Sequence, residues 1–199
     1  LLQEIKLIVH ELPDIETEAE AIVCNNTQEY ITLTNGLSDN PNLYTYLWST
    51  GATSRTIMVN EAGTYSVTVT NGNGCEKVRT ITVTASDEAV IDDVIVTDLT
   101  DNNTVTIIAT PATEVNTTYQ YSIDMPNGPF QTSNFFEDVK PGIHTVYVID
   151  EKGCGIVSKE ISVLAIPKFF TPNGDGVNET WNVIGIKSSL YEKSNIYIF

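Results

Sequence analysis

The chain has 199 residues, and its 10 Lys and Arg against 26 Asp and Glu give it a net charge of −16. A field of this sign repels phosphate backbones and anionic lipid heads, which argues against nucleic-acid binding and membrane-surface adsorption. Hydrophobic residues make up 41% of the chain, enough to build folded cores, and no apolar run approaches the roughly 20 residues of a membrane-spanning helix. The composition predicts a folded, acidic, extracellular protein.

Residues 1–12 alternate apolar and polar side chains at Ile5, Leu7 and Val9, and Pro13 follows. This pattern is typical of a half-buried strand that a proline ends. A lone strand cannot bury its apolar face, so we expect residues 1–12 to be the last strand of a preceding module.

Residues 13–86 carry short alternating runs at roughly 8–12-residue spacing, which is typical of a β-sandwich. Turn sequences such as Asn35-Gly36 and Asn71-Gly72 separate the runs. The predicted strands are residues 29–34, 44–48, 55–59, 64–70 and 78–83.

Tyr44, Tyr46 and Trp48 alternate along one predicted strand. Such a row can be an exposed glycan-binding face, or its tryptophan can be the core anchor of the sandwich. We expect the core anchor, and burial of Trp48 would make the module a spacer.

The sequence from Glu61 to Val67 resembles the acidic-x-Gly-x-Tyr-x-Cys corner of immunoglobulin-type sandwiches. The resemblance implies that the Tyr65 hydroxyl ties a loop to its strand. Val67 stands where that family has its inter-sheet cysteine, so the usual disulfide is absent from this position.

Residues 87–165 repeat the first module at an offset of 79 residues, since Gly142 and Cys154 match Gly63 and Cys75. At the same offset His144 replaces Tyr65, so we expect it to substitute for the tyrosine in the corner. An internal repeat of this kind is typical of a modular stalk.

The turn sequences of the second module, at 121–124, 128–130 and 141–142, resemble the SprB-type repeats of Bacteroidota surface proteins. The first module resembles the PKD-like and immunoglobulin-like repeats of the same kinds of protein. These resemblances imply two tandem immunoglobulin-like β-sandwich modules.

The chain has three cysteines, so at most one internal disulfide can form. We expect a bridge between Cys24 and Cys75 at one end of the first module. Cys154 is then a buried free thiol or pairs outside this chain.

Residues 169–181 read F-F-T-P-N-G-D-G-V-N-E-T-W. This stretch resembles F-x-P-N-G-D-G-x-N-[DE]-x-W, which opens the gliding motility-associated C-terminal domain of Bacteroidota. That domain is the type B sorting domain of the type IX secretion system. The family's later Asp-Arg-x-Gly and Trp-Asp-Gly turns do not occur by Phe199, so we expect residues 166–199 to be the N-terminal part of a truncated small β-sandwich.

The resemblance implies that residues 166–199 are an export signal. An outer-membrane translocon and its shuttle protein would read it, after a signal peptide has taken the protein to the periplasm. The passenger would then stay at the cell surface or be released. The residues expected to form the recognition loop are Phe170, Pro172, Asn173, Asp175, Gly176, Asn178 and Trp181.

The loop also matches half of a calcium-binding template, with oxygen ligands available from Asn173, Asp175 and Glu179. Thr171 stands at the first position and Asn182 where the bidentate Glu belongs. The alternative is a turn of Asn and Asp side chains held by its own backbone bonds. No other cofactor is expected.

Catalytic motifs are absent from the sequence. His10 and His144 belong to different modules, and no Gly-rich phosphate loop or nucleophile elbow occurs. Glu16, Glu18 and Glu20 alternate as expected for the solvated face of a strand or linker. We therefore expect no enzyme in this chain, although an enzyme domain could precede Leu1.

The predicted fold class is all-β: tandem immunoglobulin-like sandwiches followed by the start of the sorting domain. The predicted function is the C-terminal part of a secreted surface protein, with stalk modules and a secretion signal. The alternative is an adhesin or polysaccharide-binding repeat array.

Overall fold

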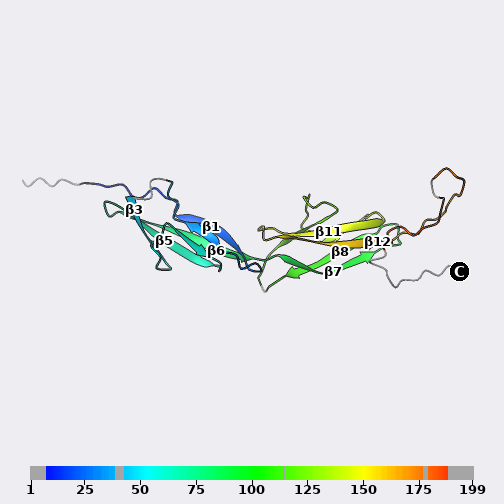
Figure 1. The fold of residues 1–199 in the computed structure, drawn as a ribbon, viewed down its shortest axis with the longest axis horizontal. Coiled ribbons are helices and arrows are strands. Elements are labelled where there is room, and N and C mark those ends of the chain that lie inside the picture. The colour runs from blue at the N-terminus through cyan, green and yellow to red at the C-terminus, as the bar shows by residue number, and fades with distance from the viewer. Residues whose placement is uncertain (1–7, 39–42, 114, 177–178, 188–199) are drawn as a thin grey trace, which may run out of the picture. The chain divides into compact units, whose positions relative to one another are not determined.

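A computed structural model describes residues 8–38, 43–113, 115–176 and 179–187 (Figure 1). The chain divides into two compact units, Leu1–Ser86 and Asp87–Phe199. Both are built from β-strands, so the predicted all-β class is confirmed.

The first unit is a sandwich of two sheets. One sheet has the strand order β1-β6-β5-β3, and the other pairs β2 with β4. β1 runs parallel to β6, whereas the other pairs are antiparallel. The strands are β1 (Glu18–Cys24), β2 (Ile31–Thr34), β3 (Tyr44–Trp48), β4 (Thr56–Val59), β5 (Gly63–Asn71) and β6 (Glu76–Ser86).

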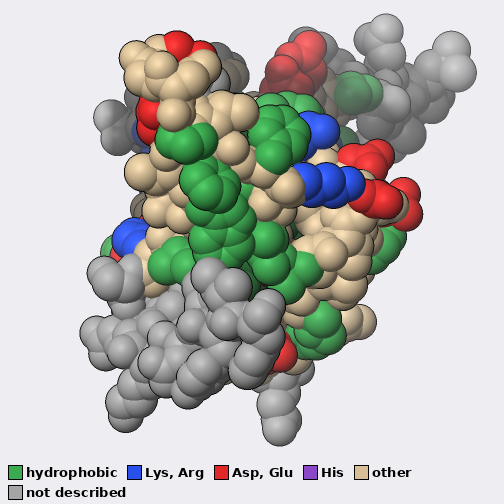
Figure 2. Space-filling model, turned by 90° about the vertical axis from the view of Figure 1, so that its right-hand side faces the viewer, with side chains coloured by type: hydrophobic (Ala, Val, Ile, Leu, Met, Phe, Trp, Pro, Cys, Tyr) green, Lys and Arg blue, Asp and Glu red, His purple; other side chains and the backbone are tan. Residues whose placement is uncertain are grey.

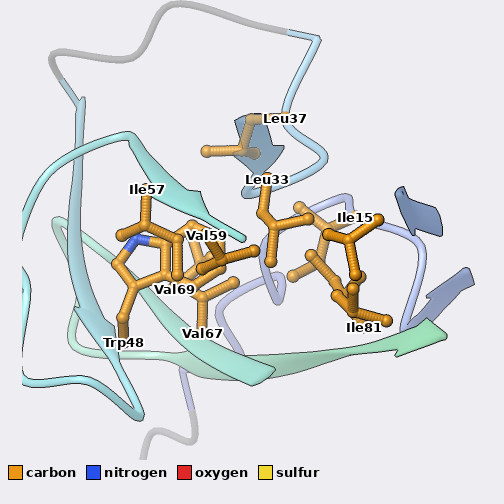
Figure 3. Close-up of a cluster of buried hydrophobic side chains, with 11 residues drawn as sticks. Ile15, Leu33, Leu37, Trp48, Ile57, Val59, Val67, Val69 and Ile81 are labelled. Atoms are coloured by element: carbon orange, nitrogen blue, oxygen red, sulfur yellow. The ribbon is translucent and has the colours of Figure 1, made fainter. Parts of the chain in front are cut away.

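The core of this unit follows from the alternation of its strands. On β5, Val67 and Val69 are completely buried, whereas Thr68 lies between them on the opposite face. Fully burying one such apolar side chain stabilises the fold by about 1.5–3 kcal/mol. Figure 3 shows the cluster, with Trp48 beside Ile57 and Val67.

Trp48 is the core anchor that the sequence predicts. Its side chain is 2% exposed, and its indole Nε1 donates a hydrogen bond of 2.8 Å to the carbonyl oxygen of Ser54. Tyr44 and Tyr46 pack against the same cluster. The three aromatic side chains therefore support the core and do not form an exposed row.

The second unit also has two sheets, with the strand orders β10-β8-β7 and β12-β11-β9. Its core lies between them and includes Val105, Ile107, Val146, Val148 and Val163, all fully buried. The strands are β7 (Ala89–Thr97), β8 (Thr104–Pro111), β9 (Tyr119–Ile123), β10 (Phe135–Phe136), β11 (Gly142–Asp150) and β12 (Ile156–Val163).

The predicted corner exists in both units. The Tyr65 hydroxyl donates to the carbonyl oxygen of Glu61 at 3.0 Å, four residues earlier. In the second unit, Nε2 of His144 lies 2.6 Å from the carbonyl oxygen of Lys140, which is also four residues earlier. His144 adds a second contact, because its Nδ1 lies 2.6 Å from a carboxylate oxygen of Asp124. The expectation that His144 substitutes for the tyrosine is confirmed.

The repeat extends to the hairpin turns that follow β5 and β11. The Asn71 side-chain oxygen accepts the backbone N–H of Cys75 at 2.9 Å, and the Asp150 carboxylate accepts that of Cys154 at 2.8 Å. A short polar side chain thus closes the same turn in each unit, in the way Asn and Asp commonly do.

The N-terminal part of the chain differs in detail from the sequence prediction. Most of the strand predicted around Ile5 lies outside the described residues, and Ile8 and Val9 belong to no strand and are exposed. The acidic stretch that follows contributes β1, whose Ala19, Ala21 and Val23 face the core while Glu18 and Glu20 face solvent.

The predicted bridge between Cys24 and Cys75 is wrong. Cys75 is a free thiol, and Cys24 is engaged in a disulfide. The parallel pairing of β1 with β6 places Cys24 opposite Ser86, at one end of β6, while Cys75 precedes Glu76 at the other end. At about 3.3 Å per residue these ends lie on the order of 30 Å apart, whereas a disulfide needs Cα atoms within about 7 Å.

Candidate functional site

The candidate site is the loop of residues 166–183, called the C-terminal loop below. It belongs to the second unit, follows β12, and ends at Ile184. Ala165 and Ile184 form an antiparallel bridge, with N–H···O distances of 3.2 and 2.9 Å in the two directions. The loop is therefore closed at its base by backbone hydrogen bonds.

The centre of the loop is held by its own polar groups. The Asn173 side-chain oxygen accepts the backbone N–H of Asp175 at 3.2 Å, and its amide nitrogen donates to the Asp175 carboxylate at 2.9 Å. The backbone N–H of Gly176 donates to a Glu179 carboxylate oxygen at 3.1 Å. Gly174 and Gly176 have φ values of +79° and +83°, where glycine is strongly favoured. The loop thus contains the Asn/Asp turn that the sequence predicts.

These bonds bear on the calcium prediction for Asn173, Asp175 and Glu179. The Asn173 and Glu179 oxygens each accept a backbone N–H, so binding a cation would compete with those bonds. Among the residues that the structure describes, no group of three or more His, Cys, Asp or Glu side chains is placed to hold a metal ion.

The loop also presents apolar side chains to solvent. Phe169 is 68% exposed and Phe170 51%, and the nearby Ile166, Ile184 and Ile186 are about half exposed. Figure 2 shows the molecule from the side on which β12 ends in Figure 1, with a connected stripe of hydrophobic side chains on that face. Exposed apolar groups gathered in this way commonly mark an interaction surface.

Trp181 connects the two sides of the loop near its base. Its indole Nε1 donates to the carbonyl oxygen of Pro167 at 3.2 Å, and its side chain is partly buried. Of the other predicted recognition residues, Pro172 is exposed like Phe170, and Asn178 lies outside the described residues. Sequence reasoning did not single out Phe169, although it is the more exposed residue of the aromatic pair.

The histidines and the exposed acidic residues form no catalytic arrangement in the described part of the chain. The two ring nitrogens of His144 contact the Asp124 carboxylate and the Lys140 carbonyl oxygen, and His10 is exposed in the first unit. Glu16, Glu18 and Glu20 are exposed, as the sequence predicts.

One buried polar cluster was not visible in the sequence. Asp87 and Asp150 are buried, and burial together with these two carboxylates raises the pKa of Tyr119 to about 12. Asp87 accepts the backbone N–H of Thr113, and Asp150 accepts the Thr117 hydroxyl at 2.6 Å. Both carboxylates therefore hold backbone or hydroxyl groups of neighbouring segments, which is a structural role.

No helix among the described residues has the length and hydrophobicity needed to cross a membrane. No family model matches the chain, and no curated protein matches it.

Several solved structures are similar in fold. A crystal structure of murine CEACAM1b has a TM-score of 0.48 at 11% identity, over 74% of this chain and 96% of that one. The N-terminal eight Ig domains of DSCAM isoform 1.30.30 give 0.38 at 15% identity, over 83% and 25%. SGBP-B of Bacteroides ovatus, solved with a mixed-linkage heptasaccharide, gives 0.26 at 11% identity, over 95% and 78%. Likenesses this distant carry no argument about function.

Proposed function

We propose that this chain is the C-terminal part of a secreted cell-surface protein, in which two immunoglobulin-like modules form a stalk and the C-terminal loop begins an export signal. The signal would be recognised by the outer-membrane translocon of the type IX secretion system and its shuttle protein. The mechanism is recognition of a folded loop and involves no chemical step on a substrate.

The observation that carries the proposal is the conformation of the loop, which orders a polar turn and exposes the side chains beside it. Asn173 bonds to Asp175, and the Gly176 N–H donates to Glu179, which gives the turn a defined shape before any partner binds. Phe170 and Pro172, beside that turn, are exposed to solvent. A preshaped polar turn next to exposed aromatic groups is suited to recognition, because little ordering entropy remains to be lost on binding.

The role of the modules as spacers is supported by the burial of Trp48 and by the packing of Tyr44 and Tyr46 on the core. A glycan-binding array would need such aromatic side chains on the surface, where sugar rings can stack on them. Because these aromatic side chains pack on the core, the sequence feature that suggested an adhesin does not support that alternative.

A reporter experiment tests the proposal. Residues 87–199, which include the second module and β12, would be fused with their native continuation behind a signal peptide and a fluorescent protein, in hosts with and without the translocon. We expect the reporter outside the cell only when the translocon is present. Retention in the periplasm of both hosts would refute the sorting function.

A further inference from the structure

β12 is one of the two edge strands of its sheet, and the chain returns to this edge after the C-terminal loop. The bridge between Ala165 and Ile184 sets an antiparallel direction for the returning segment. Edge strands carry backbone groups that can pair with an added segment. The returning segment, Ile184–Lys187, is therefore placed where an additional strand would begin.

Contacts beyond the bridge follow the same antiparallel direction. The Ser162 hydroxyl donates to the carbonyl oxygen of Gly185. Further along, the Lys187 ammonium lies 2.6 and 2.7 Å from the two carboxylate oxygens of Glu160. As the residue number rises from 184 to 187, the partner number falls from 165 to 160, so the contacts keep one antiparallel direction, with a shift of two positions between the bridge and the contacts that follow it.

Gly185, in the returning segment, is a position at which the backbone leaves no room for a side chain. Its φ is +86°, and a Cβ placed on it would collide with the carbonyl oxygen of Val163. Gly153, in the turn between β11 and β12, has a similar φ of +88° but open space around it. The requirement at Gly185 therefore comes from the close approach of the returning chain to β12 as well as from the backbone conformation.

We propose that folded β12 is a docking edge for the chain's own segment Ile184–Lys187, and that this contact closes the base of the C-terminal loop. Trp181 adds a second contact across the base through its hydrogen bond to Pro167. Without the β12 edge, neither the Ala165–Ile184 bridge nor the Ser162 and Glu160 contacts can form. The loop then adopts its closed form only when the second module is folded.

This coupling has a consequence that rests on the proposed function. A translocon that recognises the closed loop would thereby also select chains whose second module is folded. An unfolded passenger would display an open loop and would be a poorer export substrate.

The test is amide hydrogen exchange of Ala165 and Ile184 in the full 199-residue chain, compared between Gly185→Ala and Gly153→Ala. Both substitutions place a side chain at positive φ, so they share the backbone strain. Only Gly185→Ala adds the collision with Val163. We expect Gly185→Ala to raise the exchange rates of these two amides by about tenfold or more, and Gly153→Ala to leave them near the wild-type values.

A second comparison tests the coupling to module folding. Val148 and Val69 are equivalent in the repeat and both fully buried, one in each unit. We expect Val148→Ala to lower the urea concentration at which the Ala165 and Ile184 amides lose protection, and Val69→Ala to leave it unchanged.

The proposal is overturned if these amides exchange at unprotected rates in the wild-type chain. It is also overturned if the two glycine variants are equal or if the two valine variants have the same effect. None of these measurements involves the translocon, so a failure of export would refute the sorting function without changing the exchange rates.

Discussion

A substitution at His144 tests most directly whether this residue replaces the corner tyrosine in the second module. Its ring is largely buried, with 12% of the side chain exposed, and both ring nitrogens lie 2.6 Å from an oxygen atom. The perturbation we choose is His144→Phe, which keeps a planar ring of similar size and removes both polar contacts. The matched change in the first module is Tyr65→Phe, which removes only the bond to Glu61.

The expected magnitudes follow from the partners. A hydrogen bond to a neutral group contributes about 0.5–1.5 kcal/mol, and one to a charged group about 1.5–3 kcal/mol. Tyr65→Phe loses one neutral bond. His144→Phe loses a contact with the Lys140 carbonyl and another with the Asp124 carboxylate, so we expect it to cost about 2–4 kcal/mol. Asp124 keeps the backbone N–H of Thr145, which limits the loss.

Because the chain has two compact units, a single unfolding curve does not give the free energy of unfolding of either one. Hydrogen exchange of the central strand amides reports each module by itself: those of β11 for His144→Phe and those of β5 for Tyr65→Phe. If the His144→Phe variant is as stable as wild type, or costs less than Tyr65→Phe does in its own module, the corner assignment is refuted.

Three further predictions concern the core, the thiols and the pH dependence. Trp48→Ala should destabilise the first module by about 3–5 kcal/mol, against less than about 0.5 kcal/mol for the exposed neighbour Leu47→Ala, measured by hydrogen exchange of the β5 amides. Alkylation without reduction should label Cys75 alone, read by peptide mass; labelling of a second cysteine would contradict the disulfide assignment. Folded Tyr119 keeps its proton to about pH 12, whereas the unfolded residue loses it near 10, so between these values stability should fall as pH rises. Tyr119→Phe should flatten that fall, and equal slopes in the two proteins would contradict the shift.

Much of the fold could be predicted because its signals are local. The two-residue period of β5 and β11 identifies the buried valines, and the fixed offset between the modules identifies His144 as the counterpart of Tyr65. The turns closed by Asn71 and Asp150 lie at the same offset, although their side-chain bonds could be seen only in the structure.

The cysteine pairing could not be predicted, because it depends on which strand β1 joins and in which direction. Parallel pairing with β6 carries Cys24 to the end of β6 opposite Cys75, and nothing in the local pattern of β1 specifies that partner. The missed polar cluster has the same cause, since Asp87 and Asp150 are 63 positions apart and resemble any exposed aspartates in the sequence.

The C-terminal loop was predicted in part. Its turn residues are local, and Asn173 and Asp175 bond as turn chemistry suggests. The closure of its base depends on the close approach of Gly185 to the backbone of Val163. A glycine in the sequence does not by itself indicate such a contact.

The most direct measurement of the sorting function is the cell-surface fraction of the full chain with a changed loop. The chain with its native continuation would be expressed behind a signal peptide in a host that has the translocon, as wild type, with Phe169 and Phe170 both changed to Ala, and with Tyr30→Ala. Tyr30 is a similarly exposed aromatic residue in the first module and serves as the control. We predict that the Phe169/Phe170 double variant accumulates in the periplasm while Tyr30→Ala and wild type reach the surface. Equal surface fractions for all three proteins would contradict recognition of the loop.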